Sequence, residues 1–270
     1  MSMSNNSISQ EHYKYLKKIK RRKQIISITQ VTIFILAIIL WEIAARLDLI
    51  DTFLTSSPSD IVKMFVKMVE GGDLAYHVGI SIVENIVGFT AGTFLGVIIA
   101  TALWWSDFWA KVLEPYLVVL NTLPKTALAP IIIIWIGTGY QGIIVTAIIT
   151  SVVITIMNMF NSFISVDEDK IKLLKTFGAS KLQTFTKLVF PQSIPAMIST
   201  LKVNIGLSWI GVIVGEFLVS RAGIGYLIVY GGQVFQFDLI MMSLFILTIV
   251  SVVMYKLVSI IENKYLKWHQ

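Results

Sequence analysis

The sequence predicts an all-α integral membrane protein with six transmembrane helices. Of its 270 residues, 56% are apolar and only 14% are charged. The mean hydropathy is +0.78, well above the range of soluble domains. One crossing of a hydrocarbon core of roughly 30 Å needs about 20 helical residues, so the apolar content suffices for about five to seven crossings with short connections. This composition excludes a large extramembrane domain.

Residues 1–24 form a polar segment ahead of the first apolar run. Seven Lys and Arg residues lie within 14–23, and the apolar run covers 25–45. This run is longer than the roughly 7–15 apolar residues of a cleavable signal sequence. We therefore expect a basic cytoplasmic N-terminal segment over 1–24 and an uncleaved first span, which opens a single transmembrane domain covering 25–270.

A short amphipathic helix is expected between the first and second spans. Apolar residues recur at helical spacing after Pro58, and Ser57 can cap the helix while the proline occupies its first position. Gly71 and Gly72 can end it. Because one face is apolar and the other polar, we expect this helix to lie on the membrane surface.

The second span is expected over about 80–105. Three glycines lie four residues apart on one face of this helix: Gly88, Gly92 and Gly96. Small residues at this spacing let two helices approach closely. We therefore interpret the three glycines as a packing surface rather than a ligand site.

The third apolar region, 112–136, contains three prolines: Pro115, Pro124 and Pro130. Proline interrupts helical hydrogen bonding, so we expect a kinked or discontinuous entry followed by a firm span over 126–136. Asn121 and Lys125 also belong to this region.

Three further spans complete the chain. A glycine-rich turn at 137–142 leads tightly into a fourth span over about 143–164, and a polar loop covers 166–190. The fifth span, a second amphipathic stretch and the sixth span are expected at 194–219, 224–237 and 239–261.

The distribution of positive charge predicts that both termini are cytoplasmic. Sixteen of the 22 Lys and Arg residues fall in the segments that this topology places inside, and the outside segments contain only Arg46, Lys63, Lys67 and Arg221. Cytoplasmic segments of membrane proteins carry such an excess. The net charge of +6 is thus explained by the lipid bilayer as a partner, and no nucleic-acid partner is expected.

Metal, cofactor and enzyme chemistry are not expected. The chain has no cysteine, and its three histidines, His12, His77 and His269, lie outside the apolar spans. This removes thiol chemistry and His/Cys metal clusters. Ser208 lies in a fragment that lacks the second glycine of a nucleophile elbow, and no histidine is near it in the sequence. No catalytic residue, metal site or cofactor is therefore predicted.

The loop over 166–190 carries the clearest functional motif. A helical run, KIKLLKTF, is followed by Gly178-Ala-Ser180 and then by a second run, KLQTFTKLVF, which we expect to stop at Pro191. Glycine allows a sharp turn, and Ser180 can form a capping box with Gln183. We interpret 166–190, called the knob below, as a compact cytoplasmic helix–turn–helix. An ordered loop without a partner is the alternative.

The knob resembles the coupling segment of permeases in binding-protein-dependent ABC importers. That family has the pattern Glu-Ala-Ala, three residues, Gly, nine residues, then Ile-x-Leu-Pro. Here Gly178 is followed after nine residues by Leu188-Val-Phe190-Pro191, and the Glu-Ala-Ala positions hold Lys172-Leu173-Leu174. The glycine and the proline match the family pattern, whereas the acidic residue does not.

The resemblance extends from about residue 50 to the C-terminus and looks most like the branch that serves sulfonates, taurine, nitrate and some vitamin precursors. Three fragments carry it: LPKTALAPIIIIWIGTG at 123–139, KTFGASKLQTFTKLVFPQSIP at 175–195 and GEFLVSRAGIGYLI at 215–228. The resemblance implies a permease of the bacterial inner membrane with several partners. These are two cytoplasmic ATP-binding subunits, an external solute-binding protein and a second permease subunit, which we expect to be a second copy of this chain in a homodimer, with a heterodimer as the alternative.

The resemblance also implies that the ATPase contacts the knob. The expected contact residues are Lys172, Leu173, Leu174, Phe177, Gly178, Ala179, Ser180 and Pro191. A knob seated in a cleft of the ATPase would move the attached spans as rigid bodies when the ATPase pair closes. ATP hydrolysis would then take place in the partner and not in this chain.

Four residues near membrane depth are candidates for the translocation pathway: Glu84, Asn121, Lys125 and Glu216. Ionisable groups inside lipid cost about 2.5–3.5 kcal/mol, so they should face protein, water or an interface. Lys125 directly follows a helix-breaking proline and could present its charge to an anion. Structural pairing is the alternative, and Lys202 is expected to snorkel to the cytoplasmic surface.

Two other function classes stay open. An ion-coupled secondary transporter or channel would need a relay of buried carboxylates, for which only Glu84 and Glu216 are available. A non-transporting membrane scaffold would not need the proline-broken third region. No internal repeat divides the spans into two similar halves, which counts against an inverted-repeat transporter.

Overall fold

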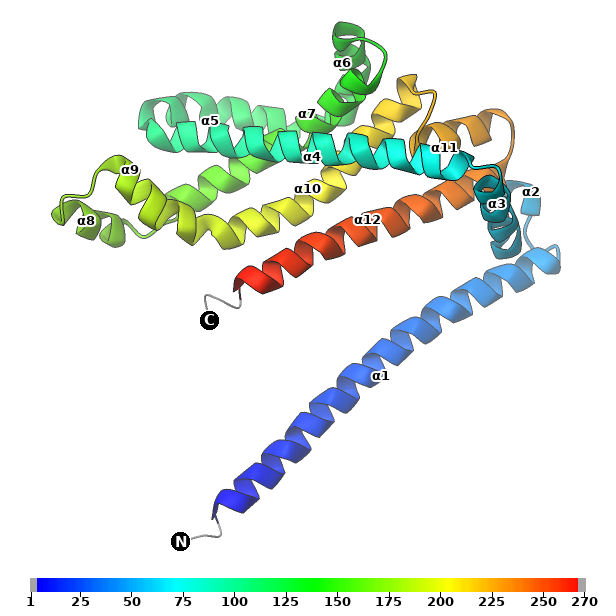
Figure 1. The fold of residues 1–270 in the computed structure, drawn as a ribbon, viewed down its shortest axis with the longest axis horizontal. Helices are drawn as coiled ribbons and strands as arrows, with labels where there is room; N and C mark the ends of the chain where they lie inside the picture. The colour runs from blue at the N-terminus through cyan, green and yellow to red at the C-terminus, as the bar shows by residue number, and fades with distance from the viewer. Residues whose placement is uncertain (1–3, 267–270) are drawn as a thin grey trace. The chain divides into compact units, whose positions relative to one another are not determined.

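The computed structural model describes residues 4–266, and all regular structure in that range is helical (Figure 1). Five helices are long and apolar enough to cross a membrane, and a sixth crossing is counted if one bent pair of helices acts as a single span. The expectation of an all-α membrane protein is therefore confirmed. The chain divides between Lys63 and Met64 into two compact units, each described by itself below.

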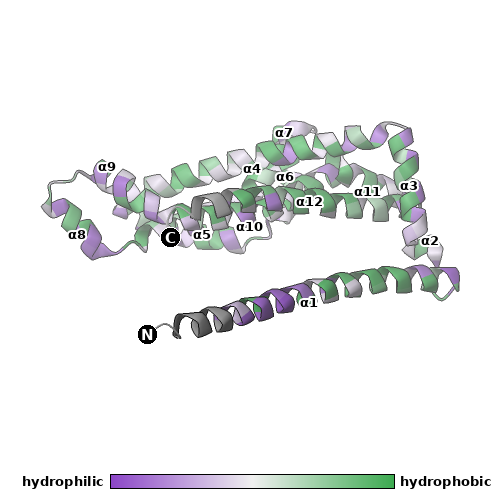
Figure 2. Ribbon diagram, turned by 60° about the horizontal axis from the view of Figure 1, so that its bottom comes forward, coloured by the Kyte–Doolittle hydropathy of each residue, from purple (hydrophilic) through white to green (hydrophobic). Residues whose placement is uncertain are grey.

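The first unit is dominated by one long helix, α1 (Ser4–Arg46). The basic segment and the first apolar run form a single helix without a break, and Figure 2 shows the change along it from hydrophilic to hydrophobic residues. The apolar side chains beyond residue 24 are almost all exposed. An apolar helix that is exposed all round is stable only where lipid covers it.

A polar corner follows α1. Glu42 accepts hydrogen bonds from the Arg46 side chain at 2.7 Å and from the backbone N–H of Ser59 at 3.1 Å. The short helix α2 (Thr52–Thr55) lies between these contacts and is capped by Asp51. The corner therefore fixes the direction in which the chain leaves α1.

The predicted amphipathic helix is α3 (Pro58–Glu70). Its start is as expected, because the Oγ of Ser57 accepts from the backbone N–H of Asp60 at 3.2 Å. Hydrogen bonds from Lys63 and from Ser57 hold the pKa of Asp60 below its usual value. The helix ends at Glu70, and the chain then turns at Gly72, whose φ of 79° lies in the left-handed region that favours glycine.

Three helices form the core of the second unit: α4 (Asp73–Trp105), α7 (Tyr140–Ile164) and α10 (Phe190–Val219). The predicted glycine stripe of α4 is buried against α7. A Cβ atom on Gly88 would come within 2.6 Å of the Cβ of Ala147, so only glycine permits this approach. The packing interpretation of the stripe is confirmed.

Hydrogen bonds between polar side chains connect α10 to both α4 and α7. The amide of Asn204 donates to Thr93 at 2.9 Å and to Thr155 at 2.7 Å, while Asn85 donates to Ser208 at 3.1 Å. Such bonds hold transmembrane helices together where water cannot compete for the donors.

The third apolar region breaks, as its prolines predict, but it breaks more sharply than expected. Helix α5 (Asp107–Thr122) is followed by a 3₁₀ turn and by α6 (Ala129–Ile136), and the two parts meet at 88°. The expected firm span over 126–136 is wrong, because the eight residues of α6 extend only about 12 Å, less than half of a hydrocarbon core. The extended backbone at Leu123 and Pro124 causes the break.

The knob contains two short helices, α8 (Glu168–Thr176) and α9 (Lys181–Thr184), at one end of the second unit (Figure 1). Helix α9 continues through a π turn, Phe185–Val189, directly into α10. The expectation that Pro191 stops the helix is wrong. The wider π turn, in which the N–H of Phe190 donates to the carbonyl of Phe185, lets the helix run on, and Pro191 lies in the first turn of α10, where a missing N–H costs least.

The opposite end of the second unit is built by α11 (Ile224–Gln233), which leads into α12 (Phe237–Leu266). Helix α11 packs on α10 and α12 and buries Ile224 and Leu227. The chain then turns at Phe235, which has a φ of 57° and a side chain 65% exposed. The predicted amphipathic stretch is therefore a helix with one buried face, and it ends four residues earlier than expected.

Candidate functional site

The knob exposes apolar side chains at its tip. Phe177 is 80% exposed and Leu173 is 56% exposed, while Leu174 and Ala179 are half-buried. Phe177 immediately precedes the turn at Gly178. Exposed large apolar residues on a polar knob are typical of a protein contact surface.

The turn of the knob has the predicted geometry. Gly178 has a φ of 79°, and no atom lies within 4 Å of the position that a Cβ would take, so its backbone conformation alone favours glycine. The predicted capping box is present. The backbone N–H of Gln183 donates to the Oγ of Ser180 at 3.2 Å, and the backbone N–H of Ser180 donates to the Gln183 side chain at 2.8 Å.

Lys172 occupies the position of the acidic residue in the family pattern. It forms exposed ion pairs with Glu168 at 3.6 Å and with Asp169 at 3.2 Å on the same helix. Such surface pairs contribute little stability. Helix α8 therefore still carries acidic side chains, but they lie one turn before the position at which the family pattern has its acidic residue.

The base of the knob is anchored to α4. The ammonium of Lys181 donates to the backbone carbonyl of Trp105 at 2.7 Å and lies over the Trp104 ring, 5.5 Å from its centroid. Phe185 contacts Trp104 and the Phe163 ring of α7, with centroid distances of 5.0 and 5.3 Å. A cation at a helix C-terminus is favourable, so this contact fixes α9 to the ends of two core helices. The sequence gives no local signal for it.

The other end of the bundle carries a second polar cluster, called the clasp here, around the first turn of α11. The backbone N–H groups of 223–225 donate in turn to His77 at 3.0 Å, to Ser81 at 2.7 Å and to Glu216. Ser81 also donates to Glu216 at 2.5 Å. Side chains from α4 and α10 therefore cap α11, a role that residues on the helix itself usually perform.

Glu84 and Glu216, two of the candidate pathway residues, meet inside this end of the bundle. Each is 1% exposed, and their carboxyl groups interact. Glu216 is held by the clasp, whereas neither oxygen of Glu84 has a hydrogen bond of acceptable geometry among the described residues. The two acids are interior groups of this chain.

The other two candidates lie at the break between α5 and α6. The ammonium of Lys125 donates to the backbone carbonyl of Asn121 at 3.1 Å, and the Asn121 side chain is exposed. Lys202, expected to snorkel, pairs with Glu262 of α12, one residue beyond the predicted end of the sixth span, and lies 5.7 Å from the centroid of the Tyr255 ring. Within the described range, no three His, Cys, Asp or Glu residues are grouped as a metal site would need.

Comparison with known proteins identifies the family. Residues 92–265 match the model of the family described as binding-protein-dependent transport system inner membrane component. The chain belongs to this family. It is thus a permease subunit of a binding-protein-dependent ABC importer, an integral protein of the inner membrane and a translocation component rather than an enzyme.

Curated relatives lie within one group of permeases. The chain is 26% identical over 231 residues to the putative aliphatic sulfonates transport permease SsuC of Bacillus subtilis, which covers 86% of this chain and 84% of that one. It is 28% identical over 240 residues to the formylaminopyrimidine transport permease ThiX of Halalkalibacterium halodurans, covering 88% and 94%. These matches extend over most of both chains.

A solved structure supports the fold. A bacterial alginate ABC transporter, crystallised in complex with a periplasmic protein that binds an alginate pentasaccharide, contains a chain that matches this permease with a TM-score of 0.62. The match covers 92% of this chain and 97% of that chain at 12% identity. At that identity the likeness establishes the fold.

Two polar clefts open on the surface of the permease bundle. One, of about 520 Å³ between α7 and α10 near the knob, is lined by hydroxyl and amide side chains that include Asn158, Asn161 and Ser199. The other, of about 580 Å³ near the clasp, includes Tyr76, Tyr140 and the one charged side chain Arg221 among its described lining residues. Neither cleft could be predicted from the sequence, because serine and asparagine scattered through apolar helices form no recognisable pattern.

Proposed function

We propose that this permease forms the translocation pathway for a small solute of the sulfonate, taurine, nitrate or vitamin-precursor type and couples transport to ATP hydrolysis by a partner ATPase. The observation that carries this proposal is the knob: a helical turn with exposed apolar residues at its tip and a base fixed to α4 and α7.

The anchoring of the knob supports a coupling role. A lever transmits motion only if its base is rigid. Phe177 and Leu173 are available for an ATPase cleft, while Lys181 and Phe185 tie the same element to the core helices. Movement of the tip would therefore be carried into the bundle without any catalytic group in this chain.

The partner set follows from the same proposal. Two cytoplasmic ATP-binding subunits would bind the knobs of a permease pair, which we propose to be a homodimer, and an external solute-binding protein would dock near the clasp. The structure of the alginate transporter, crystallised with a periplasmic protein, is a precedent for the docking of a periplasmic protein on an ABC transporter. The knob and both termini are then cytoplasmic, and the clasp is external.

The polar clefts favour a small polar or anionic solute. Hydroxyl and amide groups near the knob could replace part of the hydration of a solute, and none of the described residues that line this cleft is charged. Arg221 gives the cleft near the clasp a positive charge, which favours an anion such as a sulfonate. Lys125 remains a second candidate for anion contact, whereas the burial of Glu84 and Glu216 favours an interior role.

Substitution of the exposed tip tests ATPase coupling. Phe177→Asp places a charge where an apolar contact is proposed, and Phe235→Asp is the matched control because Phe235 is also largely exposed but lies at the other end of the bundle. After purification from native membranes, the control should retain a stoichiometric ATPase and the Phe177 variant should lose it. Full ATPase retention by Phe177→Asp would rule out the proposed contact.

Cross-linking tests docking of the binding protein. Cysteines at Ser220 and Gln233 flank α11, and the native chain has no cysteine to interfere. Either position should capture the binding protein during ATP-driven uptake. If neither does while uptake is normal, docking near the clasp is wrong. The rival class, an ion-coupled transporter, would need neither partner.

A further inference from the structure

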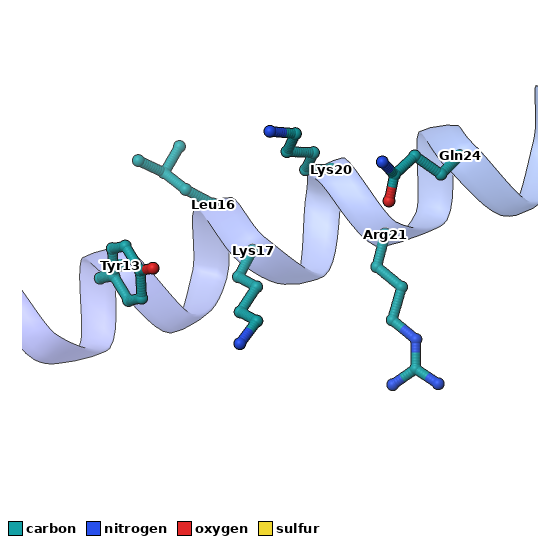
Figure 3. Close-up of a pocket in the computed structure, with 6 residues that line it drawn as sticks. All are labelled: Tyr13, Leu16, Lys17, Lys20, Arg21 and Gln24. Atoms are coloured by element: carbon teal, nitrogen blue, oxygen red, sulfur yellow. The ribbon is translucent and has the colours of Figure 1, made fainter.

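The basic part of α1 forms an open trough along one helix face (Figure 3). Its volume is about 650 Å³, and its lining consists of Tyr13, Leu16, Lys17, Lys20, Arg21 and Gln24. In Figure 3, Lys17 and Arg21 extend on one side of the helix, and Leu16 and Lys20 extend on the other. The trough thus has cations on both of its sides and an apolar side chain among them.

The positive charge of this face is not neutralised within the helix. The sequence contains no Asp or Glu from His12 to Trp41, although seven bases lie within 14–23. Within residues 12–46, the one ion pair of the structure joins Arg46 to Glu42 at the far end of the helix. Lys17, Lys20 and Arg21 are all exposed. The described part of this helix therefore supplies no negative charge to Lys17, Lys20 or Arg21.

The position of the trough along the helix indicates where that charge can come from. The apolar run over 25–45 has 21 residues and extends about 32 Å, the thickness of a hydrocarbon core. Lys20 and Arg21 lie four to five residues before it, or about 6–8 Å, and headgroup layers are about 5–8 Å deep. The reach of the side chains brings Lys17 to the same layer.

We propose that this trough binds the phosphate of an anionic phospholipid headgroup in the cytoplasmic leaflet. The guanidinium of Arg21 can bind a phosphate through two parallel N–H donors, and the ammonium groups of Lys17 and Lys20 add positive charge. The proposal uses the cytoplasmic N-terminus of the proposed function, and it concerns lipid binding rather than transport.

The test compares two sets of substitutions with equal loss of charge. The site variant combines Lys17→Gln, Lys20→Gln and Arg21→Gln. The control variant combines Lys14→Gln, Lys18→Gln and Arg22→Gln, three bases that share a different face of the same helix at 100° per residue. Each full-length permease is purified in detergent and titrated with phosphatidylglycerol or phosphatidylcholine, and bound lipid is counted by native mass spectrometry.

The site variant should bind phosphatidylglycerol roughly tenfold more weakly than the control variant, because only the site variant removes the three bases that line the trough. The two variants should bind phosphatidylcholine equally. Millimolar inorganic phosphate should not displace the bound phosphatidylglycerol. Equal losses in the two variants would mean diffuse attraction without a site. Unchanged lipid binding with loss of the co-purified ATPase in the site variant would assign the trough to a protein partner. Either result would overturn the proposal, and neither depends on whether the permease transports.

Discussion

Gly178 is the residue on which the geometry of the knob depends most. At a φ of 79° a β-branched residue is strained by about 1–2 kcal/mol or more. Gly178→Val should therefore lower ATP-driven uptake by about 5–30-fold at unchanged abundance, because the turn that presents the tip is distorted. Uptake is measured in proteoliposomes with the partner proteins present.

Gly72→Val is the matched control for that substitution. Gly72 also has a φ of 79° and open space around it, but it lies between α3 and α4 at the other end of the bundle. It carries the same local strain without touching the knob. Equal loss of uptake in both variants would show that strain, and not the coupling surface, is responsible.

The clasp predicts a second effect at the scale of one residue. Glu216→Ala would leave the N–H of Gly225 and the hydroxyl of Ser81 without their acceptor in a buried site. We expect a loss of about 2–4 kcal/mol in unfolding free energy, the range for a buried hydrogen-bonded group. Glu216→Gln keeps one carbonyl acceptor and should lose less. Thermal unfolding of the purified permease measures both, and equal stability of Glu216→Ala and the native chain would contradict this role.

Residues whose role depends on neighbours in the chain could be predicted from the sequence. The left-handed turn at Gly178 and the capping box of Ser180 follow from local spacing, and both are present. The clasp and the contact between Lys181 and Trp105 could not be predicted, because the partners are far apart in the sequence. Only the tertiary fold brings such groups together.

At the scale of elements, the packing of α4 against α7 can be tested within one helix. Gly88→Val would drive a side chain into Ala147, whereas Gly79→Val on the same helix meets nothing within 4 Å. We expect Gly88→Val to destabilise the bundle by about 1–3 kcal/mol through overpacking, and Gly79→Val to cost much less. Detergent-solubilised thermal unfolding gives the comparison. A similar loss for the two variants would remove the packing role of the glycine stripe.

Element positions were predicted well where apolar length and flanking turn residues agree, as for α3 and α7, whereas α4 begins at Asp73, seven residues before the expected start of the second span. They were predicted poorly around proline. Pro191 does not end a helix as expected, because a π turn allows the helix to continue. The residues after Pro124 do not form the expected firm span, because the chain bends by 88° there. Proline removes one hydrogen bond in each case, and tertiary packing decides whether the helix bends, widens or stops.

At the scale of the whole molecule, the topology can be tested with reporters. A reporter after Gln270 or near Gln183 should read as cytoplasmic, and one near Asp51 or Gln233 should read as external, because the excess of Lys and Arg lies on the side of the termini and the knob. One reversed position would overturn the six-span topology and the assignment of the clasp to the outer face.

The most direct measurement is solute uptake into proteoliposomes that contain this permease and its ATPase, with the solute-binding protein supplied outside. A panel of sulfonates, taurine, nitrate and vitamin precursors is offered with and without ATP inside. The account predicts uptake of one of these solutes that requires both ATP and the binding protein and that falls in Gly178→Val. Uptake that a proton or sodium gradient drives without ATP would contradict it.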